Sequence, residues 1–118
     1  MLISIVVPVF NEEDNIQNFY HAVTEVMKQV TYDYELIFVD DGSKDGSAAI
    51  LQALSQDDQH VKVLLLARNF GHQLALTCGL DYAKGDAVIT MDGDMQHPPT
   101  LIPDLIRLWE EGNDVVRT

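Results

Sequence analysis

Hydrophobic positions along the chain follow two alternating periods. Four short apolar runs have the length of strands buried on both faces, and they cover residues 3–7, 35–39, 61–66 and 87–91. Each run is followed by a segment in which apolar residues recur every three or four positions, which predicts a helix. The helices cover residues 15–30, the segment that carries Ile50, Leu51 and Leu54, residues 74–83, and the segment opened by Pro98 and Pro99. Residues 114–117 begin as a further strand would.

The alternation of strands and helices predicts an α/β fold with one domain over residues 1–118. Such a pattern builds a mostly parallel, Rossmann-like sheet with helices on both faces, joined by right-handed crossovers. Ligands of open α/β sheets bind beyond the carboxyl ends of the strands, where the strand order reverses. The residues that follow each strand are therefore the first place to look for chemistry.

Composition and charge narrow the class of protein. Of the 118 residues, 47% are hydrophobic, which suffices for a core, and the apolar runs are far shorter than the roughly 18 residues of a membrane-spanning helix. No segment is organised like a signal peptide, so we expect these residues to be cytoplasmic. The net charge of −12, with only seven basic residues, argues against nucleic acid as a partner. The single cysteine, Cys78, excludes an internal disulfide and is expected in the core.

Polar clusters follow the first four predicted strands. Their sequences are PVFNEED, DDGSKDGS, ARNFGHQ and MDGDMQHPP. Because parallel strands end at one edge of a sheet, we expect six polar residues to converge there: Asn11, Glu12, Asp40, Asp41, Asp92 and Asp94. Like charges repel at short range, so this cluster calls for a cation or a bound ligand among the carboxylates.

Asp92, Gly93 and Asp94 form the sharpest local feature. Two carboxylates one residue apart, just past a buried strand, can reach a divalent cation and a sugar ring, and hard oxygen ligands favour Mg²⁺ or Mn²⁺. A simple turn in which one Asp caps the next helix explains the same three residues. Gln96 and His97 are further candidate ligands, although a single His near a turn is usually solvated.

Two other clusters carry candidate binding residues. Asp40, at the end of a strand, can accept hydrogen bonds from a nucleobase or a ribose, whereas the Gly, Ser and Asp residues after it suit a turn and a helix cap. Arg68 can meet a base or phosphates with its planar guanidinium, and a salt bridge with neighbouring carboxylates is the alternative. His72 and Gln73 are interpreted as polar residues at a helix start.

Together, four segments resemble family 2 glycosyltransferases of the GT-A fold. They are VVPVFNEEDNI, ELIFVDDGSKDGS, LARNFGHQLALTCGLDYAKGD and VITMDGDMQHPP, and they run through nearly all of the chain in the order of that family's N-terminal half. The most similar branch is the polyprenyl-phosphate glycosyltransferases, of the dolichol-phosphate mannose synthase and bactoprenol glucosyltransferase type. Each motif alone is weak evidence, but four linked motifs are strong evidence.

The resemblance implies a nucleotide pocket at the ends of the first three strands. Asp40 matches the acidic residue near the nucleobase, with Asp41 beside it. Arg68 matches a basic or polar position beside the nucleotide. The loop implied to line the same pocket contains Pro8, Val9, Asn11 and Glu12.

The D-x-D element of the family matches Asp92, Gly93 and Asp94, and many relatives carry Ala at the middle position. Asp92 and Asp94 are therefore the implied catalytic residues, and Asp92 and Gly93 also belong to the implied nucleotide site. By the same resemblance, Asp94 is the metal ligand and Gln96 a further ligand, with Mg²⁺ or Mn²⁺ as the cofactor.

The implied reaction transfers a hexose from a UDP- or GDP-linked sugar to a polyprenyl phosphate or a related acceptor, with inversion at the anomeric carbon. Family members of this branch continue with acceptor-binding segments and, usually, membrane helices. The resemblance therefore implies a fragment, and a complete protein at the cytoplasmic face of the membrane. We expect weak, metal-dependent nucleotide binding and poor turnover from the fragment, and a homo-oligomer stays possible.

Three other classes of protein share parts of this pattern. A non-catalytic nucleotide-binding relative stays open, because a fold does not guarantee turnover. A phosphoacceptor receiver domain needs an acidic pair after its first strand and an acceptor Asp after its third, where this chain has Leu66, Ala67 and Arg68. A Rossmann dehydrogenase needs a glycine-rich turn after its first strand, and PVFNEED contains no glycine.

Overall fold

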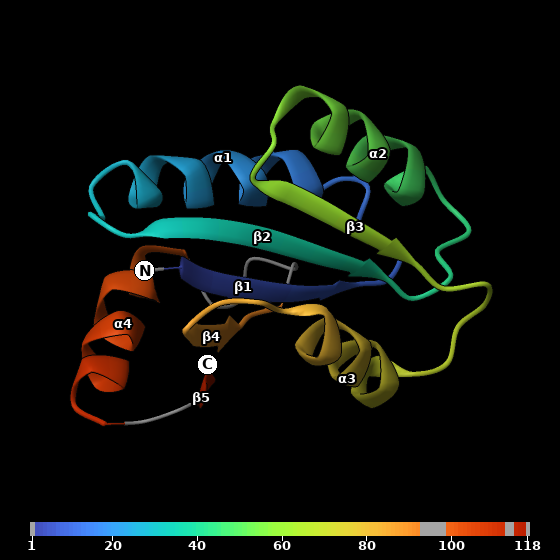
Figure 1. The fold of residues 1–118 in the computed structure, drawn as a ribbon. Coiled ribbons are helices and arrows are strands. Elements are labelled where there is room, and N and C mark those ends of the chain that lie inside the picture. Colours follow the sequence, from blue (N-terminus) through green and yellow to red (C-terminus); the bar gives the residue numbers. More distant parts are fainter. Residues whose placement is uncertain (1, 93–98, 113–114, 118) are drawn as a thin grey trace.

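The computed structural model describes residues 2–92, 99–112 and 115–117, with a parallel five-stranded sheet at its centre (Figure 1). The strands are β1 (Leu2–Val9), β2 (Asp33–Asp40), β3 (Val61–Leu65), β4 (Ala87–Thr90) and β5 (Val115–Arg117). Their order across the sheet is β3-β2-β1-β4-β5. The helices are α1 (Ile16–Met27), α2 (Ser47–Asp57), α3 (His72–Tyr82) and α4 (Ile102–Glu110), and a short 3₁₀ helix, η1 (Pro99–Leu101), precedes α4.

The predicted α/β fold with a parallel sheet and helices on both faces is confirmed, and the differences lie at the ends of elements. β2 continues through Asp40, because Asp40 pairs with Val9 of β1 and its carbonyl accepts a hydrogen bond from the Leu66 N–H at 2.9 Å. α1 stops at Met27, earlier than predicted. α3 begins at His72, earlier than the predicted start at residue 74, so this histidine lies in the first turn of the helix.

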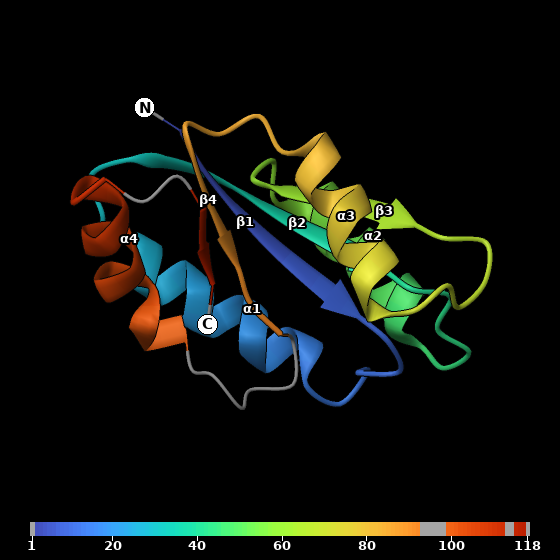
Figure 2. The ribbon, with the colours of Figure 1, turned by 90° about the horizontal axis from the view of Figure 1, so that it is seen from below.

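Two hydrophobic cores lie on opposite faces of the sheet, because side chains alternate along each strand. The larger core joins β1, β2 and β4 to α1, α2 and α4 and includes Ile5, Phe38 and Ile89, all fully buried. The smaller core lies under α3 and includes Val6 and Ile37. In the view of Figure 2, α3 lies in front of β1 and β2, on the side opposite α1.

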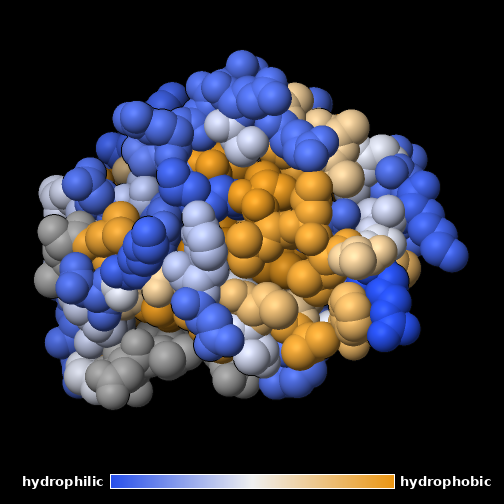
Figure 3. Space-filling model, turned by 45° about the vertical axis from the view of Figure 1, so that its right-hand side comes forward, coloured by the Kyte–Doolittle hydropathy of each residue, from blue (hydrophilic) through white to orange (hydrophobic). Residues whose placement is uncertain are grey.

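α3 approaches β1 closely at one glycine. A Cβ atom added to Gly79 would lie 2.3 Å from Cγ1 of Val6, so a larger residue would push the helix off the sheet. The smaller core is only partly covered, since Leu64, Leu66 and Leu80 are half-buried against it. Figure 3 shows a broad hydrophobic area on the side of the molecule where β2, β3 and α3 lie at the right of Figure 1.

The last crossover differs in hand from the other three. α1, α2 and α4 pack into the same core, yet β2 and β3 lie on one side of β1 whereas β5 lies beyond β4 on the other side. The β4–α4–β5 connection therefore has the opposite hand to β1–α1–β2, and the prediction of right-handed crossovers throughout is wrong for this sheet. The cause is the packing of α4, whose Ile102, Leu105 and Ile106 join the core of α1.

The strand order reverses between β1 and β4, which are neighbours in the sheet although three helices separate them in the sequence. Such a switch point is where open α/β sheets place their ligand sites, at the carboxyl ends of the strands. Within residues 2–92 and 99–112, no helix has the length and apolar character needed to span a bilayer.

Candidate functional site

The carboxyl ends of three strands lie level with one another. Val9 of β1 pairs with Asp40 of β2, and Asp40 pairs with Leu65 of β3. β4 is set back along the sheet, because its last residue, Thr90, pairs with Val6. The loops after β1, β2 and β3 can therefore contact one another directly, and the chain leaving β4 passes β1 before it reaches the same edge.

The loop after β1 is held against the loop after β2 by hydrogen bonds. The Asn11 N–H donates to Oγ of Ser43 at 2.8 Å, and Oδ1 of Asn11 accepts from the Lys44 N–H at 2.9 Å. The Glu12 N–H donates to Oγ of Ser47 at 3.0 Å. Asn11 has a φ of 52°, a left-handed conformation that Asn adopts more readily than most residues. Asn11 and Glu12 thus shape this edge through their backbone and side-chain contacts.

Asp41 is buried, with 3% of its surface exposed, and its carboxylate binds the loop between β3 and α3. It accepts hydrogen bonds from the N–H of Phe70 at 2.8 Å, the N–H of Gly71 at 3.1 Å, and the side-chain amide of Asn69 at 3.3 Å. Gly71 has a φ of 103°, which favours glycine at this position. Asp41 therefore fixes the segment that leads directly into α3.

Asp40 is equally buried, at 3%, but its carboxylate has a different environment. Asp40 lies two residues after Phe38, so its side chain is on the face of the larger core, whereas the carboxylate of Asp41 binds the loop before α3 on the other face. Among the described residues, Oδ1 of Asp40 has no hydrogen-bond partner. Leaving a buried acceptor unpaired costs about 1–3 kcal/mol.

A cavity of about 400 Å³ opens beside Asp40. Its lining comes from the ends of β2 and β3 and the loops that follow them: Asp40, Gly42, Ser43, Lys44, Ala48, Leu65, Leu66, Ala67, Arg68 and Asn69. Arg68 is exposed, and its guanidinium carbon lies 4.6 Å from the ring centre of Phe70. The cavity therefore combines a buried carboxylate with a cation stacked on an aromatic ring.

Asp92 lies on the other side of β1 and contacts α3. Its Oδ1 is 2.9 Å from Nε2 of His72, and the two side chains are 44% and 61% exposed. A cavity of about 190 Å³ lies here, lined by Pro8, His72, Gln73, Leu76, Thr90, Met91 and Asp92. Asp92 and His72 thus form a polar pair at the mouth of a small cavity.

A third cavity, of about 200 Å³, shares lining residues with each of the other two and is called the linking cavity below. It shares Pro8 and His72 with the cavity beside Asp92, and it shares Asn69 with the cavity beside Asp40. Its remaining lining residues are Val9, Phe10, Asp41 and Gly71. The three cavities are therefore neighbours at the carboxyl edge of the sheet.

The structure brings the predicted site residues to one edge but not into one cluster. Asp40 and Asp41 face opposite sides of the sheet, and Asp92 pairs with His72 on the α3 side, so these three carboxylates reach the predicted edge without forming one cluster. Within the described residues, no group of three or more His, Cys, Asp and Glu could hold a metal ion. Gly93, Asp94, Gln96 and His97 lie outside the described residues.

The chain matches one protein family over nearly its whole length. Residues 4–117 match glycosyl transferase family 2. The chain is a member of that family.

Two curated relatives are similar to this family 2 chain. An uncharacterized glycosyltransferase of Bacillus subtilis, YkcC, is 52% identical over 113 residues, which are 96% of this chain and 35% of that protein. The bactoprenol glucosyl transferase of Shigella phage SfV is 49% identical over 116 residues, covering 98% of this chain and 38% of that protein. The chain therefore spans little more than a third of the relatives that it matches.

Among solved structures, the mannosyltransferase PcManGT from Pyrobaculum calidifontis, in complex with GDP-Man and Mn²⁺, matches 78% of this chain and 27% of its own length. The TM-score is 0.68 and the sequence identity is 23%. At that identity the similarity shows the fold alone, and the predicted GT-A fold of this family 2 member is confirmed.

Sequence reasoning missed two contacts of the site. It treated His72 as an ordinary polar residue at a helix start, whereas His72 holds the carboxylate of Asp92. It predicts Asp41 as a nucleotide-binding residue beside Asp40 and does not predict the hydrogen bonds between its carboxylate and the loop before α3. No local pattern identifies these contacts, because each joins residues that are 20 to 30 positions apart in the chain.

Proposed function

We propose that this chain is the nucleotide-sugar-binding part of an inverting, metal-dependent glycosyltransferase that moves a hexose from a nucleotide diphosphate sugar to a polyprenyl phosphate. Membership in family 2 and 49% identity to a bactoprenol glucosyl transferase support the reaction class and the lipid acceptor. Because the chain spans 38% of that relative, we assign acceptor binding and catalytic turnover to the complete protein. We assign that protein to the cytoplasmic face of the membrane.

The unpaired Oδ1 of Asp40 carries this proposal. Uracil presents an imide N–H and guanine a lactam N–H, and a buried carboxylate oxygen without a partner among the described residues is the acceptor that such a donor needs. A base in the cavity beside Asp40 would also lie near the guanidinium of Arg68, which can stack on a planar ring or meet phosphates. UDP and GDP are therefore the nucleotides proposed.

The diphosphate and the sugar are assigned to the neighbouring cavities between Asp40 and Asp92. Pro8 and Val9 form part of the wall, and Asn11 and Glu12 hold the adjoining loop. Asp41 organises the opposite loop, and its proposed role is to shape the pocket. A ligand extended across these cavities would pass from the base cavity to the carboxylate of Asp92.

The chemistry of the donors at the far end fits a divalent cation. Asp92 offers partly exposed carboxylate oxygens, and we propose that Asp94 and Gln96 add further oxygens, the ligands that Mg²⁺ and Mn²⁺ prefer. When bound, the cation would neutralise charge on the diphosphate leaving group. Asp92 and Asp94 are thus the proposed catalytic residues, and Gly93 is proposed with Asp92 as part of the nucleotide site.

Calorimetric titration of the chain with UDP-glucose and GDP-mannose, in Mn²⁺ and in EDTA, tests the proposal. We expect one of the two ligands to bind, and to bind more tightly with Mn²⁺. Asp40→Asn should weaken binding about tenfold, because a hydrogen bond to a charged group contributes about 1.5–3 kcal/mol. The matched control is Asp57→Asn, an exposed carboxylate on α2 far from the cavities. Equal affinities for wild type and Asp40→Asn would refute the base site.

A further inference from the structure

We propose that His72 is a positioning residue for the carboxylate of Asp92, and that Asp41 sets the position of His72 through the start of α3. The inference rests on the proposed function, because it concerns how the nucleotide end and the metal end of the same site are held together. Neither His72 nor Asp41 needs to touch the reacting atoms in this role.

The first step concerns the hydrogen bonds between Asp41 and the residues before α3. Its buried carboxylate accepts from two consecutive backbone N–H groups, those of Phe70 and Gly71, and from the Asn69 side chain. These bonds fix the backbone immediately before His72, the first residue of the helix. The backbone of Gly42 also lies directly against this loop, because a Cβ on Gly42 would lie 2.2 Å from the carbonyl carbon of Arg68.

The second step is the contact between His72 and Asp92. Nε2 lies 2.9 Å from Oδ1, so the imidazole can hold one carboxylate oxygen in place and leave the other free. Both side chains are largely exposed and line the same cavity. A carboxylate in that setting would otherwise sample several rotamers, and a ligand held in one rotamer binds a cation with less loss of entropy.

The third step is the place of His72 between the cavities. It lines both the cavity beside Asp92 and the linking cavity, whose wall also includes Asp41. A displacement of the loop before α3 would therefore reach both cavities at once. The consequence is that Asp41, close to the nucleotide end, and Asp92, at the metal end, are coupled through the first turn of α3.

The test measures how much Mn²⁺ strengthens nucleotide binding, as the ratio of the UDP or GDP affinity in Mn²⁺ to that in EDTA. His72→Ala should reduce this ratio about tenfold, the lower end of the effect of losing a residue that orients a metal ligand. The melting temperature should stay at the wild-type value, because His72 is exposed, and the affinity in EDTA should fall much less than the affinity in Mn²⁺. His72→Gln, whose amide replaces the Nε2 donor, should recover most of the ratio.

Two further variants complete the set. Asp41→Asn should lower both the ratio and the melting temperature, since it weakens the hydrogen bonds of a buried acceptor. His21→Gln, an exposed histidine on α1, is the matched control and should change nothing.

The outcomes separate this inference from the proposed function. If Asp40→Asn weakens binding as expected and His72→Ala keeps the full Mn²⁺ ratio, the positioning role is overturned and the function stands. An equal loss of affinity in Mn²⁺ and in EDTA for His72→Ala would mean direct contact with the nucleotide, which also overturns it. A wild-type chain that binds neither nucleotide, with or without Mn²⁺, would overturn both.

Discussion

The two ends of the sheet use buried polar groups in opposite ways. At the amino end, Glu35 accepts hydrogen bonds from Oγ of Ser4 at 2.5 Å and from the Lys84 N–H at 2.8 Å, and the Gly85 N–H donates to the same Oγ at 2.8 Å. At the carboxyl end, Asp40 is as buried as Glu35, but its Oδ1 has no partner in the described part of the chain.

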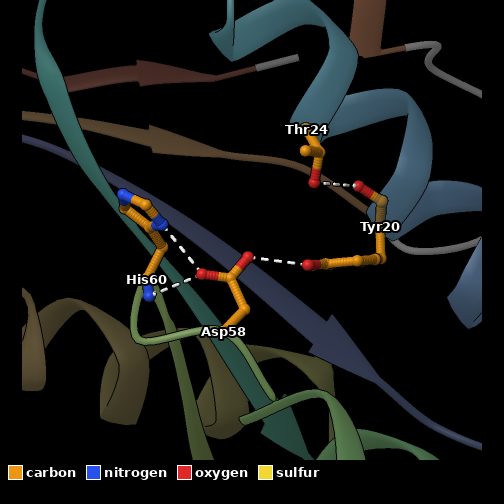
Figure 4. A network of polar contacts seen from close by, with 4 residues as sticks. All are labelled: Tyr20, Thr24, Asp58 and His60. Atoms are coloured by element: carbon orange, nitrogen blue, oxygen red, sulfur yellow. Dashed lines mark hydrogen bonds and ion pairs between the residues drawn. The ribbon is translucent and has the colours of Figure 1, made fainter.

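A second network at the amino end follows the same rule (Figure 4). Asp58 accepts from the Tyr20 hydroxyl at 2.7 Å and, through its other oxygen, from the His60 backbone N–H at 2.9 Å and faces Nδ1 of His60 at 2.8 Å. The ring of His60 stacks on Tyr34 with centroids 4.3 Å apart. The polar groups of this end are therefore satisfied within the chain, and they join α1, α2 and the sheet.

The difference separates stability from binding. A buried polar group with internal partners stabilises the fold, whereas one without a partner destabilises it until a ligand supplies the donor. The amino end thus acts as the structural end, whereas at the carboxyl end Asp40 is the buried carboxylate proposed to bind a ligand. Substitutions at the two ends should consequently change different measured quantities, and the largest effect on folding is expected at Glu35.

Glu35→Leu should destabilise the fold by about 3 kcal/mol, because it leaves the hydroxyl of Ser4 and the N–H of Lys84 without their buried acceptor. Denaturant unfolding of the variant and the wild type measures this change. Nucleotide affinity at the folded state should be unchanged. A variant as stable as the wild type would show that the hydrogen bonds of Glu35 do not stabilise the fold.

Asp58→Ala should cost about 2 kcal/mol, less than Glu35→Leu, because Asp58 is only half-buried and water can replace part of its bonding. A double-mutant cycle with Tyr20→Phe should give a coupling energy of about 1 kcal/mol for the hydroxyl–carboxylate hydrogen bond. Strict additivity of the two substitutions would contradict the contact.

Asp40→Leu should have the opposite sign and stabilise the fold by about 1 kcal/mol, because it removes a buried acceptor that has no partner. The same variant should lose nucleotide binding. Asp41→Leu is the matched comparison at the next position, equally buried, and it should destabilise because three donors lose their acceptor. Destabilisation by both substitutions to the same extent would contradict the difference in hydrogen bonding between the two carboxylates.

The smallest expected effect is on the pH dependence of stability. The hydrogen bond to Asp58, followed by burial and the carboxylate's charge, raises the pKa of Tyr20 to about 12. The folded chain therefore holds this proton above pH 10, where the unfolded chain loses it, so stability falls as pH rises from about 10 to 12. In Tyr20→Phe, the free energy of unfolding should fall less between about pH 10 and 12 than it does in the wild type. Because burial also raises the pKa of Tyr34, the difference between the two curves isolates Tyr20.

Asp58 should make the stability of the fold depend on pH in the acidic range. Burial raises the pKa of its carboxyl, but hydrogen bonds from Tyr20 and His60 outweigh burial and leave the pKa below its usual value. Folding thus favours the ionised form, and its contribution is lost as pH falls below about 4, the unfolded pKa. Unfolding curves of wild type and Asp58→Asn between pH 5 and 2 should converge. Parallel curves would contradict the shift.

The sheet and its helices could be predicted because each kind of element has its own apolar pattern. A strand buried on both faces is a short continuous apolar run, and a helix with one buried face repeats its apolar residues every three or four positions. The strand ends could be predicted as the site for the same reason, since the topology of a parallel sheet brings them to one edge. The strings PVFNEED and MDGDMQHPP indicated a sugar-nucleotide chemistry through a family resemblance that the match over residues 4–117 confirmed.

Other features could not be predicted because they depend on side-chain direction. Asp40 and Asp41 are neighbours of one residue type, and only the pleat of β2 sends one toward the larger core and the other toward α3. The partner of Asp92 depends on where α3 begins relative to the end of β4. The hand of the last crossover likewise followed from the face on which α4 packs.

The sequence by itself thus determined the order of the elements, the edge that carries the candidate site and the family, because these depend on periodicity and motif spacing. The tertiary structure alone decided that the carboxylate of Asp41 binds a neighbouring loop, that Oδ1 of Asp40 has no partner among the described residues, and that Asp92 pairs with a histidine. Those outcomes depend on distances of about 3 Å between residues far apart in the chain, and hydrogen bonds of that length leave no periodic signal in a sequence.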